Sequence, residues 1–368
     1  MADRAVCVPV KTLTAFMTDA LIAMGLPAEE AGIAADVLIT SDLWGVRSHG
    51  VAHLKMYYDR IQQGLQLPRS SPEIVKETPT TAVIDGHNGM GMVIGYRAMR
   101  IAMRKAREYG LGAVAVRNSS HYGVAGYYPL MAVHEGQAGV SFTNAHPSIA
   151  PTFGVTPKLG TNPIAVGVPT DEPFPFLFDA ATSITPRGRI EVLARAGKPI
   201  PEGWVIRRDG TPATDSATAL DDLTAETAAL LPLGGLGELM GGYKGYGLAT
   251  IVEIFSAAFQ DGTFLSGLTD FDAEGQPQFL RIGHFFLAID VEHFLPLPAF
   301  KRIAGSIVRE LRASTRAPGQ ARIYSAGEKE YENTQQVRAN GVEIPPKVQR
   351  DLLLLQEKLE IKGHNLGF

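Results

Sequence analysis

Residues 80–116 read TTAVIDGHNGMGMVIGYRAMRIAMRKAREYGLGAVAV, and this stretch decides the fold class. Ala82–Ile84 is a short apolar run typical of a strand. Gly95–Tyr109 carries apolar residues at helical spacing, and Gly112–Val116 again resembles a strand. A strand, a helix and a second strand in this order predict an α/β unit.

The turn between the first strand and the helix lacks the glycine spacing of a Rossmann fold. Gly86, Gly89 and Gly91 give the order G-x-x-G-x-G, whereas the dinucleotide-binding fingerprint is G-x-G-x-x-G. We therefore predict a sheet of another kind and do not assign this loop to a cofactor.

Segments on both sides extend the pattern. Helical periodicity dominates before the quoted stretch and returns from Pro298 onward, where Phe300, Ile303, Ile307 and Leu311 share one face. Between them, further strands are predicted at 138–143, 164–168, 176–178 and 285–289, and a further helix at 246–259.

This order predicts an α/β (α+β) fold in which a central domain interrupts a helical one. The helical domain is expected to comprise residues 1–78 and 312–368, and the central domain, with a mixed sheet, residues 79–311. Residues 185–240 are expected to form an excursion from the central domain, because the part from 199 to 222 is rich in Pro, Gly, Asp and Thr.

Composition and charge argue against several classes of protein. The 368 residues carry a formal net charge of -4, which provides no basic stripe for nucleic acid. Cys7 is the only cysteine, which excludes an intrachain disulfide and a cysteine-based zinc site. No apolar run reaches the roughly 18 residues that a membrane span needs. We therefore expect a cytoplasmic protein with no signal peptide, no membrane segment and no nucleic-acid partner.

The first candidate for chemistry is Arg47-Ser48-His49-Gly50, where a predicted helix gives way to a tight turn. Histidine suits reversible proton transfer because its ordinary pKa of about 6.5 lies near neutral pH. A capping serine beside a surface histidine would give the same pattern, and the spacing alone favours that simpler interpretation.

His49 and His53 also stand four residues apart, a spacing at which two imidazoles on a helix can bind one metal ion. In the H-E-x-x-H pattern of metalloproteases, a glutamate follows the first histidine, but here Gly50 takes its place. We therefore predict no metal site.

A second candidate is His121, in the loop NSSHYG at residues 118–123, after a predicted strand and before a predicted helix. Loops that follow strands carry many functional residues in α/β proteins. The polar residues of this loop can equally cap the helix. A functional role for His121 requires that it share a cleft with His49.

Two further stretches offer groups for a ribose or a phosphate. In Phe178–Ser183, Asp179 can accept hydrogen bonds from ribose or orient a histidine, and Thr182 can bind phosphate, although both are also common helix caps. Residues 241–247, GGYKGYG, place Lys244 and free backbone N–H groups before an apolar helix, which suits a phosphate. The stretch is not a Walker A loop, because a glycine follows the lysine.

In this order, the sequence resembles the type-2 malate/L-lactate dehydrogenase family, which also includes sulfolactate, ureidoglycolate and diketogulonate oxidoreductases and cyclic ketimine reductases. The resemblance covers nearly the whole chain. Its landmarks are SDLWGVRSHGVAHLKMYYDRI (41–61), NSSHYGVAGYYPLMA (118–132), GTNPIAVGVP (160–169), FDAATS (178–183), IPEGW (200–204), ALLPLGG (229–235), GYKGYGLATIVEI (242–254), GHFFLAID (283–290) and AGEKEYE (326–332).

The resemblance implies a homodimer with a non-Rossmann nicotinamide-binding domain and NAD or NADP as cofactor. It implies that His49, beside Ser48, exchanges a proton with the substrate oxygen, and that His121 contacts the substrate or shares that role. With Thr182 added for its hydroxyl, the expected cofactor contacts are Asp179, Ala180, Ala181, Thr182, Lys244, Gly283 and His284.

The sequence departs from the family near the first histidine. His53 and Trp44 stand where arginines are frequent, and an arginine at position 53 would suit a substrate carboxylate. We expect Arg47 to compensate, and we take Arg47, His53 and Tyr57 as the substrate-binding candidates.

The resemblance implies hydride transfer between NAD(P) and a small 2-hydroxy or 2-oxo acid, either malate/oxaloacetate or lactate/pyruvate. Malate comes first because ARAGKPIPEGW (194–204) and IYSAGEKE (323–330) resemble the malate branch. A reductase of cyclic ketimines such as piperideine-2-carboxylate is one alternative, and a metal hydrolase using His49, His53 and His121 is another. Arg187 and Arg189 are candidates for contact with the 2′-phosphate of NADP, although surface arginines would give the same pattern.

Overall fold

A mixed sheet forms the centre of the structure, a computed structural model that describes residues 4–368. Within that range seven strands form this sheet in the order β2-β3-β4-β11-β5-β6-β7. β3 and β4 run parallel, and the other neighbours run antiparallel. The strands are β2 (Glu73–Glu77), β3 (Thr81–Asp85), β4 (Leu111–Ser119), β5 (Gln137–Thr143), β6 (Ile164–Val168), β7 (Phe176–Ala180) and β11 (Ile282–Asp290). The prediction of a mixed, non-Rossmann sheet is confirmed, since a Rossmann sheet is mostly parallel.

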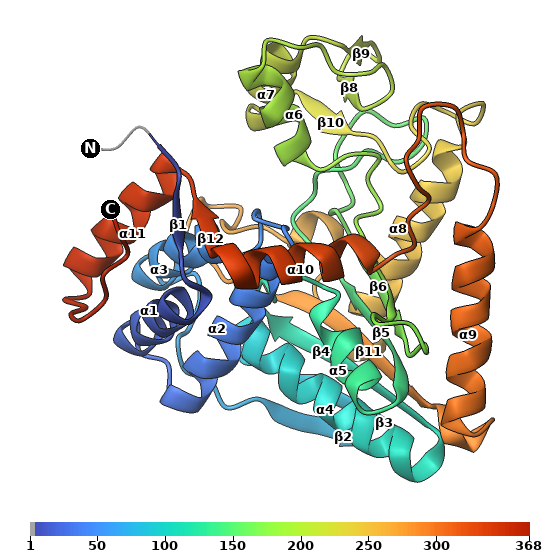
Figure 1. The fold of residues 1–368 in the computed structure, drawn as a ribbon. Helices are drawn as coiled ribbons and strands as arrows, with labels where there is room; N and C mark the ends of the chain where they lie inside the picture. The colour runs from blue at the N-terminus through green and yellow to red at the C-terminus, as the bar shows by residue number, and fades with distance from the viewer. Residues whose placement is uncertain (1–3) are drawn as a thin grey trace.

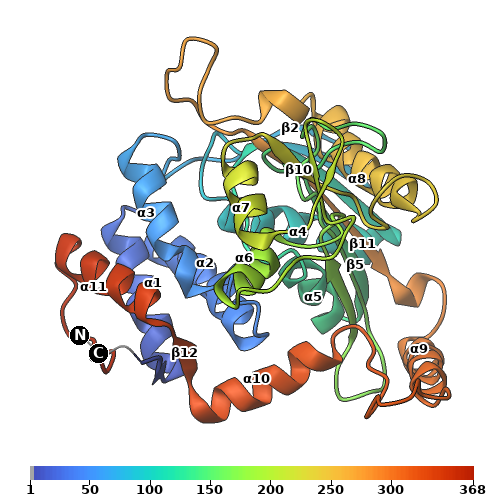
Figure 2. The same ribbon diagram turned by 90° about the horizontal axis from the view of Figure 1, so that it is seen from above.

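Helices cover both faces of this sheet (Figures 1 and 2). α4 (Gly91–Tyr109) and α5 (Tyr127–His134) pack on one face, and α8 (Gly242–Ala257) packs on the other. Successive residues of β11 serve opposite faces, as in any strand. The ring of Phe286 lies 5.2 Å from that of Tyr128 on α5, whereas the ring of Phe285 lies 5.0 Å from that of Phe255 on α8.

Segments from the two ends of the chain pack together beside the sheet (Figure 1). A short ribbon joins them, because β1 pairs antiparallel with β12. In the helical layer, α1 contacts α2, α2 contacts α10, and α3 contacts α11. The elements are β1 (Val6–Val8), α1 (Val10–Ala23), α2 (Ala28–Leu43), α3 (Leu54–Gln62), α10 (Glu328–Asn340), β12 (Val342–Ile344) and α11 (Pro346–Lys358).

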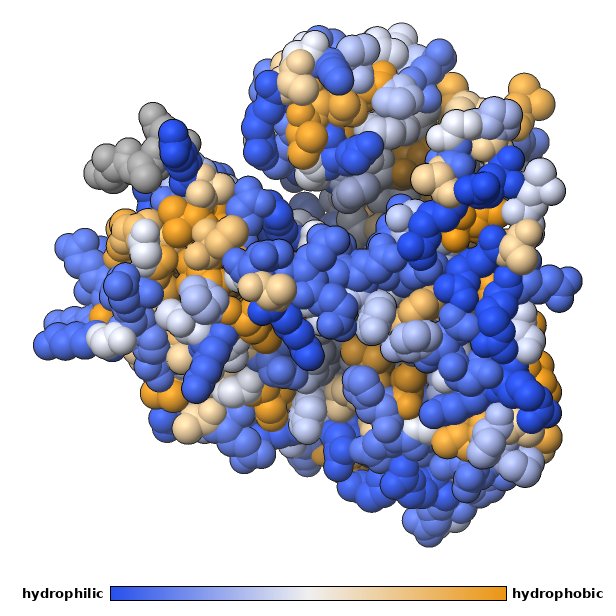
Figure 3. All heavy atoms as spheres, viewed as in Figure 1, coloured by the Kyte–Doolittle hydropathy of each residue, from blue (hydrophilic) through white to orange (hydrophobic). Residues whose placement is uncertain are grey.

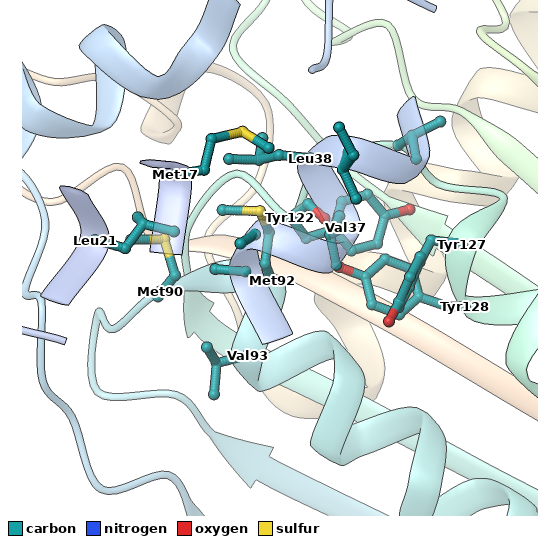
Figure 4. Packing of buried hydrophobic residues seen from close by; sticks show 14 of the residues in the cluster. Met17, Leu21, Val37, Leu38, Met90, Met92, Val93, Tyr122, Tyr127 and Tyr128 are labelled. Carbon is teal, nitrogen blue, oxygen red and sulfur yellow. The ribbon is translucent and has the colours of Figure 1, made fainter. Parts of the chain in front are cut away.

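The helical layer and the sheet share one hydrophobic core. Buried side chains of α1, α2 and α11 belong to the same cluster as those of α4 and the strands beneath it. Val37 and Leu38 of α2 lie near Met92 and Tyr122 in the close view of this core (Figure 4). The position of α2 is therefore fixed relative to the sheet by direct packing.

Residues between β7 and α8 form a small lobe with a core of its own (Figure 1). Ile190, Val205 and Ala219 are buried in it, together with Ile149 and Leu159, which precede β6. A hollow lies between this lobe and the rest of the molecule (Figure 3). The elements of the lobe are α6 (Arg187–Arg195), β8 (Val205–Arg207), β9 (Pro212–Ala213), α7 (Ser216–Thr224) and β10 (Ala228–Leu230).

α9 (Leu297–Arg312) stands at the side of the molecule (Figure 2). Ile303, Ile307 and Leu311 follow one another at four-residue spacing, and each is more than half exposed. Arg309 on the same helix forms an ion pair with Asp171 at 2.8 Å. No helix within residues 4–368 has both the length and the apolar composition to cross a membrane.

Candidate active site

The turn that carries His49 follows α2 and is held by a buried carboxylate. Gly45 has a φ of +78°, a left-handed conformation that glycine adopts readily. Asp42 then accepts a hydrogen bond from the backbone N–H of Val51 at 2.8 Å. A Cβ on Gly50 would lie 2.0 Å from Oδ1 of Asp42, so a larger residue would displace the turn. The glycine of the Ser-His-Gly sequence is therefore required by packing.

Asp42 is a residue that the sequence analysis missed. Burial raises the pKa of Asp42 to about 7, although the hydrogen bond from Val51 and the charge of Arg47 act in the opposite direction. The available signal was a carboxylate in the last turn of a helix, where the helix dipole disfavours negative charge. Such a residue needs a local partner, and here the partner is the turn before His53.

His121 comes from the loop after β4. Asn118, near the end of β4, has a φ of +51° and donates from Nδ2 to the carboxylate of Asp85 at 2.9 Å. The hydroxyl of Ser120 accepts from the N–H of Gly91 at 2.9 Å, at the start of α4. Ser120 therefore bonds at the start of the preceding helix, α4, and not at the following helix that the sequence suggested.

The loop of His121 also contacts the helix that leads to His49. Gly123 has a φ of +81°, and a Cβ there would lie 2.5 Å from Cγ1 of Val37 on α2. The same neighbourhood is visible in Figure 4, where Val37 lies beside Tyr122. Direct packing of α2 on this loop therefore brings the two histidine-bearing segments together.

Three imidazoles meet at this place. The centroids of His49 and His53 are 5.5 Å apart, those of His49 and His121 are 5.5 Å apart, and those of His53 and His121 are 5.3 Å apart. Each of the three side chains remains partly exposed. Oγ of Ser48 lies 2.9 Å from Nδ1 of His49. The structure therefore places His121 and His49 in one cluster, as a shared role requires.

The histidine cluster does not have the arrangement of a metal site. Within residues 4–368 no group of three His, Cys, Asp or Glu side chains is placed to hold a metal ion. The ring planes of His49 and His53 differ by only 12°, and those of His53 and His121 by 22°. The metal-hydrolase alternative therefore loses the site on which it depended.

The surroundings of the cluster keep its imidazoles neutral. Burial and, to a smaller extent, the neighbouring His53 together lower the pKa of His49 to about 4. Burial also lowers the pKa of His53. For His121 burial is again the main cause of a lowered pKa, and His49, His53, His284 and Arg60 act in the same direction. At neutral pH the three rings are therefore in their uncharged form.

The substrate-binding candidates occupy different environments. Arg47 is exposed and forms an ion pair with Glu343 of β12 at 2.8 Å. Tyr57 is fully buried, with its hydroxyl 2.7 Å from Nδ1 of His121. Of the three candidates, His53 lies within the cluster itself, whereas the hydroxyl of Tyr57 contacts the cluster at His121.

Asp179, near the end of β7, lies beside Gly126, which also contacts Trp44 at the end of α2. Its Oδ2 accepts a hydrogen bond from the N–H of Gly126 at 2.6 Å. A Cβ on Gly126 would lie 3.0 Å from this oxygen and 3.2 Å from the ring of Trp44, the residue that follows α2. The side chain of Asp179 is exposed to solvent, although many protein atoms surround its carboxyl group. Burial raises its pKa to about 6, the bond from Gly126 lowers it, and Glu330 raises it.

The residues after Asp179 divide into two kinds. Ala180 and Ala181 are partly exposed beside the carboxylate. Thr182 is buried, and its hydroxyl lies 3.1 Å from the carbonyl oxygen of Thr161 and 3.0 Å from that of Asn162. Because this hydroxyl already donates to the backbone, the predicted role of Thr182 in binding phosphate is not supported by its position.

Lys244 lies in the first turn of α8, which begins at Gly242, four residues before the predicted start. A Cβ on Gly245 would lie 2.3 Å from the backbone of Leu233. The glycines therefore let the helix pack closely on the preceding loop. Lys244 is exposed and, within the described residues, forms no ion pair, so its ammonium group is available beside a helix N-terminus.

Gly283 and His284 lie in the interior of the sheet. His284 is completely buried, and its Nδ1 and Nε2 each lie 2.8 Å from a hydroxyl, those of Thr143 and Ser119. A Cβ on Gly283 would lie 1.7 Å from the carbonyl oxygen of Ser256. Neither residue presents a free group to a cofactor, so their predicted contact is not supported. In the motif GHFFLAID, the first two residues therefore serve close packing: Gly283 against the backbone of Ser256, and His284 between two hydroxyls.

Comparison with known proteins agrees with this architecture. The chain matches the malate/L-lactate dehydrogenase family model over residues 8–353. It is 42% identical over 356 residues to a malate dehydrogenase of Pyrococcus horikoshii, covering 97% of this chain and 96% of that protein. It is 38% identical to an L-sulfolactate dehydrogenase of Methanocaldococcus jannaschii, covering 89% of each. The crystal structure of malate dehydrogenase from Entamoeba histolytica superposes with a TM-score of 0.93 at 42% identity, covering 98% of this chain and 99% of that one.

These matches extend over nearly the whole chain, as does the likeness of fold. The chain belongs to the malate/L-lactate dehydrogenase family. It is accordingly an oxidoreductase, a nicotinamide-dependent hydroxyacid dehydrogenase. The family predicted from the sequence is confirmed.

Proposed function

We propose that this dehydrogenase interconverts a small 2-hydroxy acid and its 2-oxo acid, with malate and oxaloacetate as the preferred pair and lactate and pyruvate next. The observation that carries the proposal is the cluster of neutral, partly exposed imidazoles around His49. The relatives named malate dehydrogenase, 42% identical over nearly the full chain, support malate as the first choice.

The residues present suit a nicotinamide dinucleotide, NAD or NADP. Asp179 offers a reachable carboxylate to ribose hydroxyls, and Ala180 and Ala181 leave space beside it. Lys244 and the backbone N–H groups at the start of α8 suit a phosphate. Such a cofactor would supply hydride transfer to and from C2 of the substrate.

His49 is the group that exchanges the proton. In oxidation of the hydroxy acid, its neutral ring accepts the proton of the C2 hydroxyl as the hydride leaves C2. Its Nε2 forms no hydrogen bond within residues 4–368 and is not enclosed. Ser48 is exposed beside Nδ1, and its hydroxyl can donate or accept. The proton can therefore leave toward solvent after each turnover.

Reduction of the oxo acid requires His49 to be protonated. The lowered pKa disfavours that state in the free protein. A substrate carboxylate beside the ring would favour the imidazolium, because an opposite charge within a few ångströms stabilises it. We therefore expect binding of the oxo acid to be coupled to uptake of a proton by His49.

The substrate carboxylate needs donors of its own. His53 lies in the cluster, and Arg47 lies two residues before His49. The ion pair of Arg47 with Glu343 is exposed, and such pairs contribute little to stability. Arg47 is therefore free to exchange Glu343 for a substrate carboxylate, as we propose.

We further propose a homodimer located in the cytoplasm, with the domain division 1–78 plus 312–368 and 79–311. Exposed apolar side chains on α8 and α9 support association, among them Ile251, Ile254, Ile303 and Ile307. Light scattering of the purified chain tests the dimer, and a monomeric mass at working concentration would contradict it.

A substrate panel tests the proposed reaction. Oxaloacetate, pyruvate, sulfopyruvate and piperideine-2-carboxylate are each assayed with NADH and with NADPH by loss of the nicotinamide absorbance. The highest kcat/KM is expected with oxaloacetate. A preference for the cyclic imine would favour the ketimine reductase alternative, and absence of turnover with all four compounds would contradict the proposal.

A further inference from the structure

Tyr57 and His121 form a buried contact that assigns different tasks to the histidines of the cluster. We propose that Tyr57 is a positioning residue that locks His121 in its neutral Nε2–H form, so that His121 donates a fixed hydrogen bond to a substrate oxygen and leaves proton transfer to His49. The nature of the substrate rests on the proposed function, whereas the state of the ring does not.

Two polar groups of the protein face the same nitrogen of His121. The hydroxyl of Tyr57 lies 2.7 Å from Nδ1, and the backbone N–H of Gly123 points at the same atom from 3.4 Å. If Nδ1 carried a hydrogen, that hydrogen would face the hydrogen of the Gly123 N–H group, and the two partial positive charges would repel each other. Both contacts are therefore satisfied when Nδ1 carries a lone pair.

The direction of the tyrosine hydrogen bond follows from burial. Tyr57 has no exposed surface, and among residues 4–368 its hydroxyl has no partner other than His121. If the hydroxyl accepted a proton from Nδ1, its own hydrogen would be buried without an acceptor, which is costly. Burial also raises the pKa of Tyr57, so the hydroxyl remains protonated. Tyr57 therefore donates.

A neutral imidazole that accepts at Nδ1 carries its hydrogen at Nε2. Nε2 of His121 makes no hydrogen bond in the described part of the chain and is not enclosed by it. The groups that face this ring are His49, His53, His284 and Arg60, and each lowers its pKa as burial does. The Nε2–H group therefore stays neutral and points at an acceptor that the protein does not supply.

His49 differs in the partner at its Nδ1. Ser48 is exposed, and its hydroxyl can rotate to donate or to accept. His49 can therefore gain or lose a proton at Nε2 while its other nitrogen stays bonded. Tyr57 allows His121 no such change, because a buried phenol of raised pKa can only donate.

This difference suits the two needs of the reaction. In reduction the C2 oxygen gains negative charge as hydride approaches the carbonyl carbon, and in oxidation it carries negative charge while its proton leaves and before hydride departure completes the carbonyl. A fixed neutral donor stabilises that charge without itself transferring a proton. A second group must then move the proton. The structure supplies one histidine for each task, and their centroids lie 5.5 Å apart.

The test measures the protonation state of the His121 ring directly, in the full chain without ligand. Nitrogen-15 labelling of histidine rings and long-range nitrogen–proton spectra distinguish a protonated Nε2 from a protonated Nδ1. The signals of His121 are assigned by their loss in His121→Asn. We expect protonated Nε2 and bare Nδ1 from mildly acidic to mildly alkaline pH. A protonated Nδ1, or titration near the ordinary histidine pKa, would overturn the proposal.

Tyr57→Phe removes the donor and keeps the ring. We expect His121 to become a mixture of neutral forms, and kcat/KM for the oxo acid to fall about tenfold, the scale of one buried hydrogen bond. Tyr58→Phe, on the next residue of α3, is the matched control and should change neither quantity. An unchanged His121 spectrum in a folded Tyr57→Phe protein would refute the role of Tyr57. The spectra give this answer even if no compound of the substrate panel is turned over.

Discussion

His121 and His284 lie in the same region of the molecule, and burial lowers the pKa of both, that of His284 to about 3. They differ in what their nitrogens contact. His284 is fully buried with each nitrogen 2.8 Å from a hydroxyl, whereas His121 uses Nδ1 alone and keeps Nε2 open. A lowered pKa therefore marks burial in both cases. A ring nitrogen that has no partner among residues 4–368 and is not enclosed separates a histidine placed for chemistry from one placed for packing.

The largest effect is expected from the open ring that exchanges the proton. His49→Ala should lower kcat at least about a hundredfold, because a general acid and base is lost. Affinity for the nicotinamide cofactor should stay nearly unchanged in a fluorescence titration. His293→Ala, at an exposed histidine of another region, is the control. Turnover near that of the unmodified protein with saturating substrate would refute the role of His49.

A smaller effect is expected at Lys244, a charged group that, like Nε2 of His121, has no hydrogen-bond or ion-pair partner in the described residues. Lys244 is exposed and without an ion pair in the described residues, so Lys244→Ala should raise the KM of the cofactor about tenfold and leave kcat nearly constant. Lys11→Ala, at an exposed lysine of α1, should change neither constant. An unchanged cofactor KM in Lys244→Ala would remove this residue from the cofactor site.

The ring of His284, whose two nitrogens are both hydrogen-bonded, should contribute to stability and have little influence on turnover. His284→Ala leaves the hydroxyl of Ser119 without its partner, removes one contact of the Thr143 hydroxyl and opens a cavity. We expect the free energy of unfolding in urea to fall by about 3 kcal/mol. Turnover per folded molecule should change by less than about threefold. A folded His284→Ala protein with a hundredfold loss of kcat would show that the comparison with His121 is mistaken.

The smallest effect is expected from pH. Neutral His49 is the proton acceptor in oxidation, and its pKa of about 4 means that it becomes protonated only as the pH falls toward that value. Between about pH 7 and about pH 5.5, kcat/KM for the hydroxy acid should therefore fall less than about twofold. If the profile of kcat/KM against pH shows a fall near pH 7 that disappears in Asp42→Asn, that fall reports the titration of the buried carboxylate. A limb near the ordinary histidine pKa that persists in this variant would contradict the lowered pKa of His49.

The sequence predicted six strands of the central sheet but missed the edge strand β2. The apolar runs of the inner strands report burial on both faces, so their positions were readable. β2 was not predicted, because the five residues EIVKE are all exposed and carry no pattern of burial. An edge strand of this kind forms through its backbone pairing with β3, which side-chain periodicity does not report.

Within the site, the sequence identified chemical types but not their contacts. His49 and His121 were chosen as imidazoles in loops, and the structure brings them together. The use of Thr182 for backbone bonding and the burial of His284 depend on residues distant in the chain, which no local motif reveals. The early start of α8 escaped prediction because glycine disfavours helices in isolation, and only close packing on Leu233 explains it.

The ribbon of β1 and β12 has a consequence for how the molecule is made. A chain emerging from the ribosome presents His49 and His121 early, but the partner of β1 is synthesised more than three hundred residues after β1 itself. Asn333 on α10, which donates to the carbonyl oxygen of Trp44 at 3.0 Å, also arrives late. A nascent chain therefore contains both histidine loops before β12 and α10, which contact the segment around His49, have been synthesised. Arrest of translation shortly before β12 would leave the chemistry-bearing residues present and their scaffold unfinished.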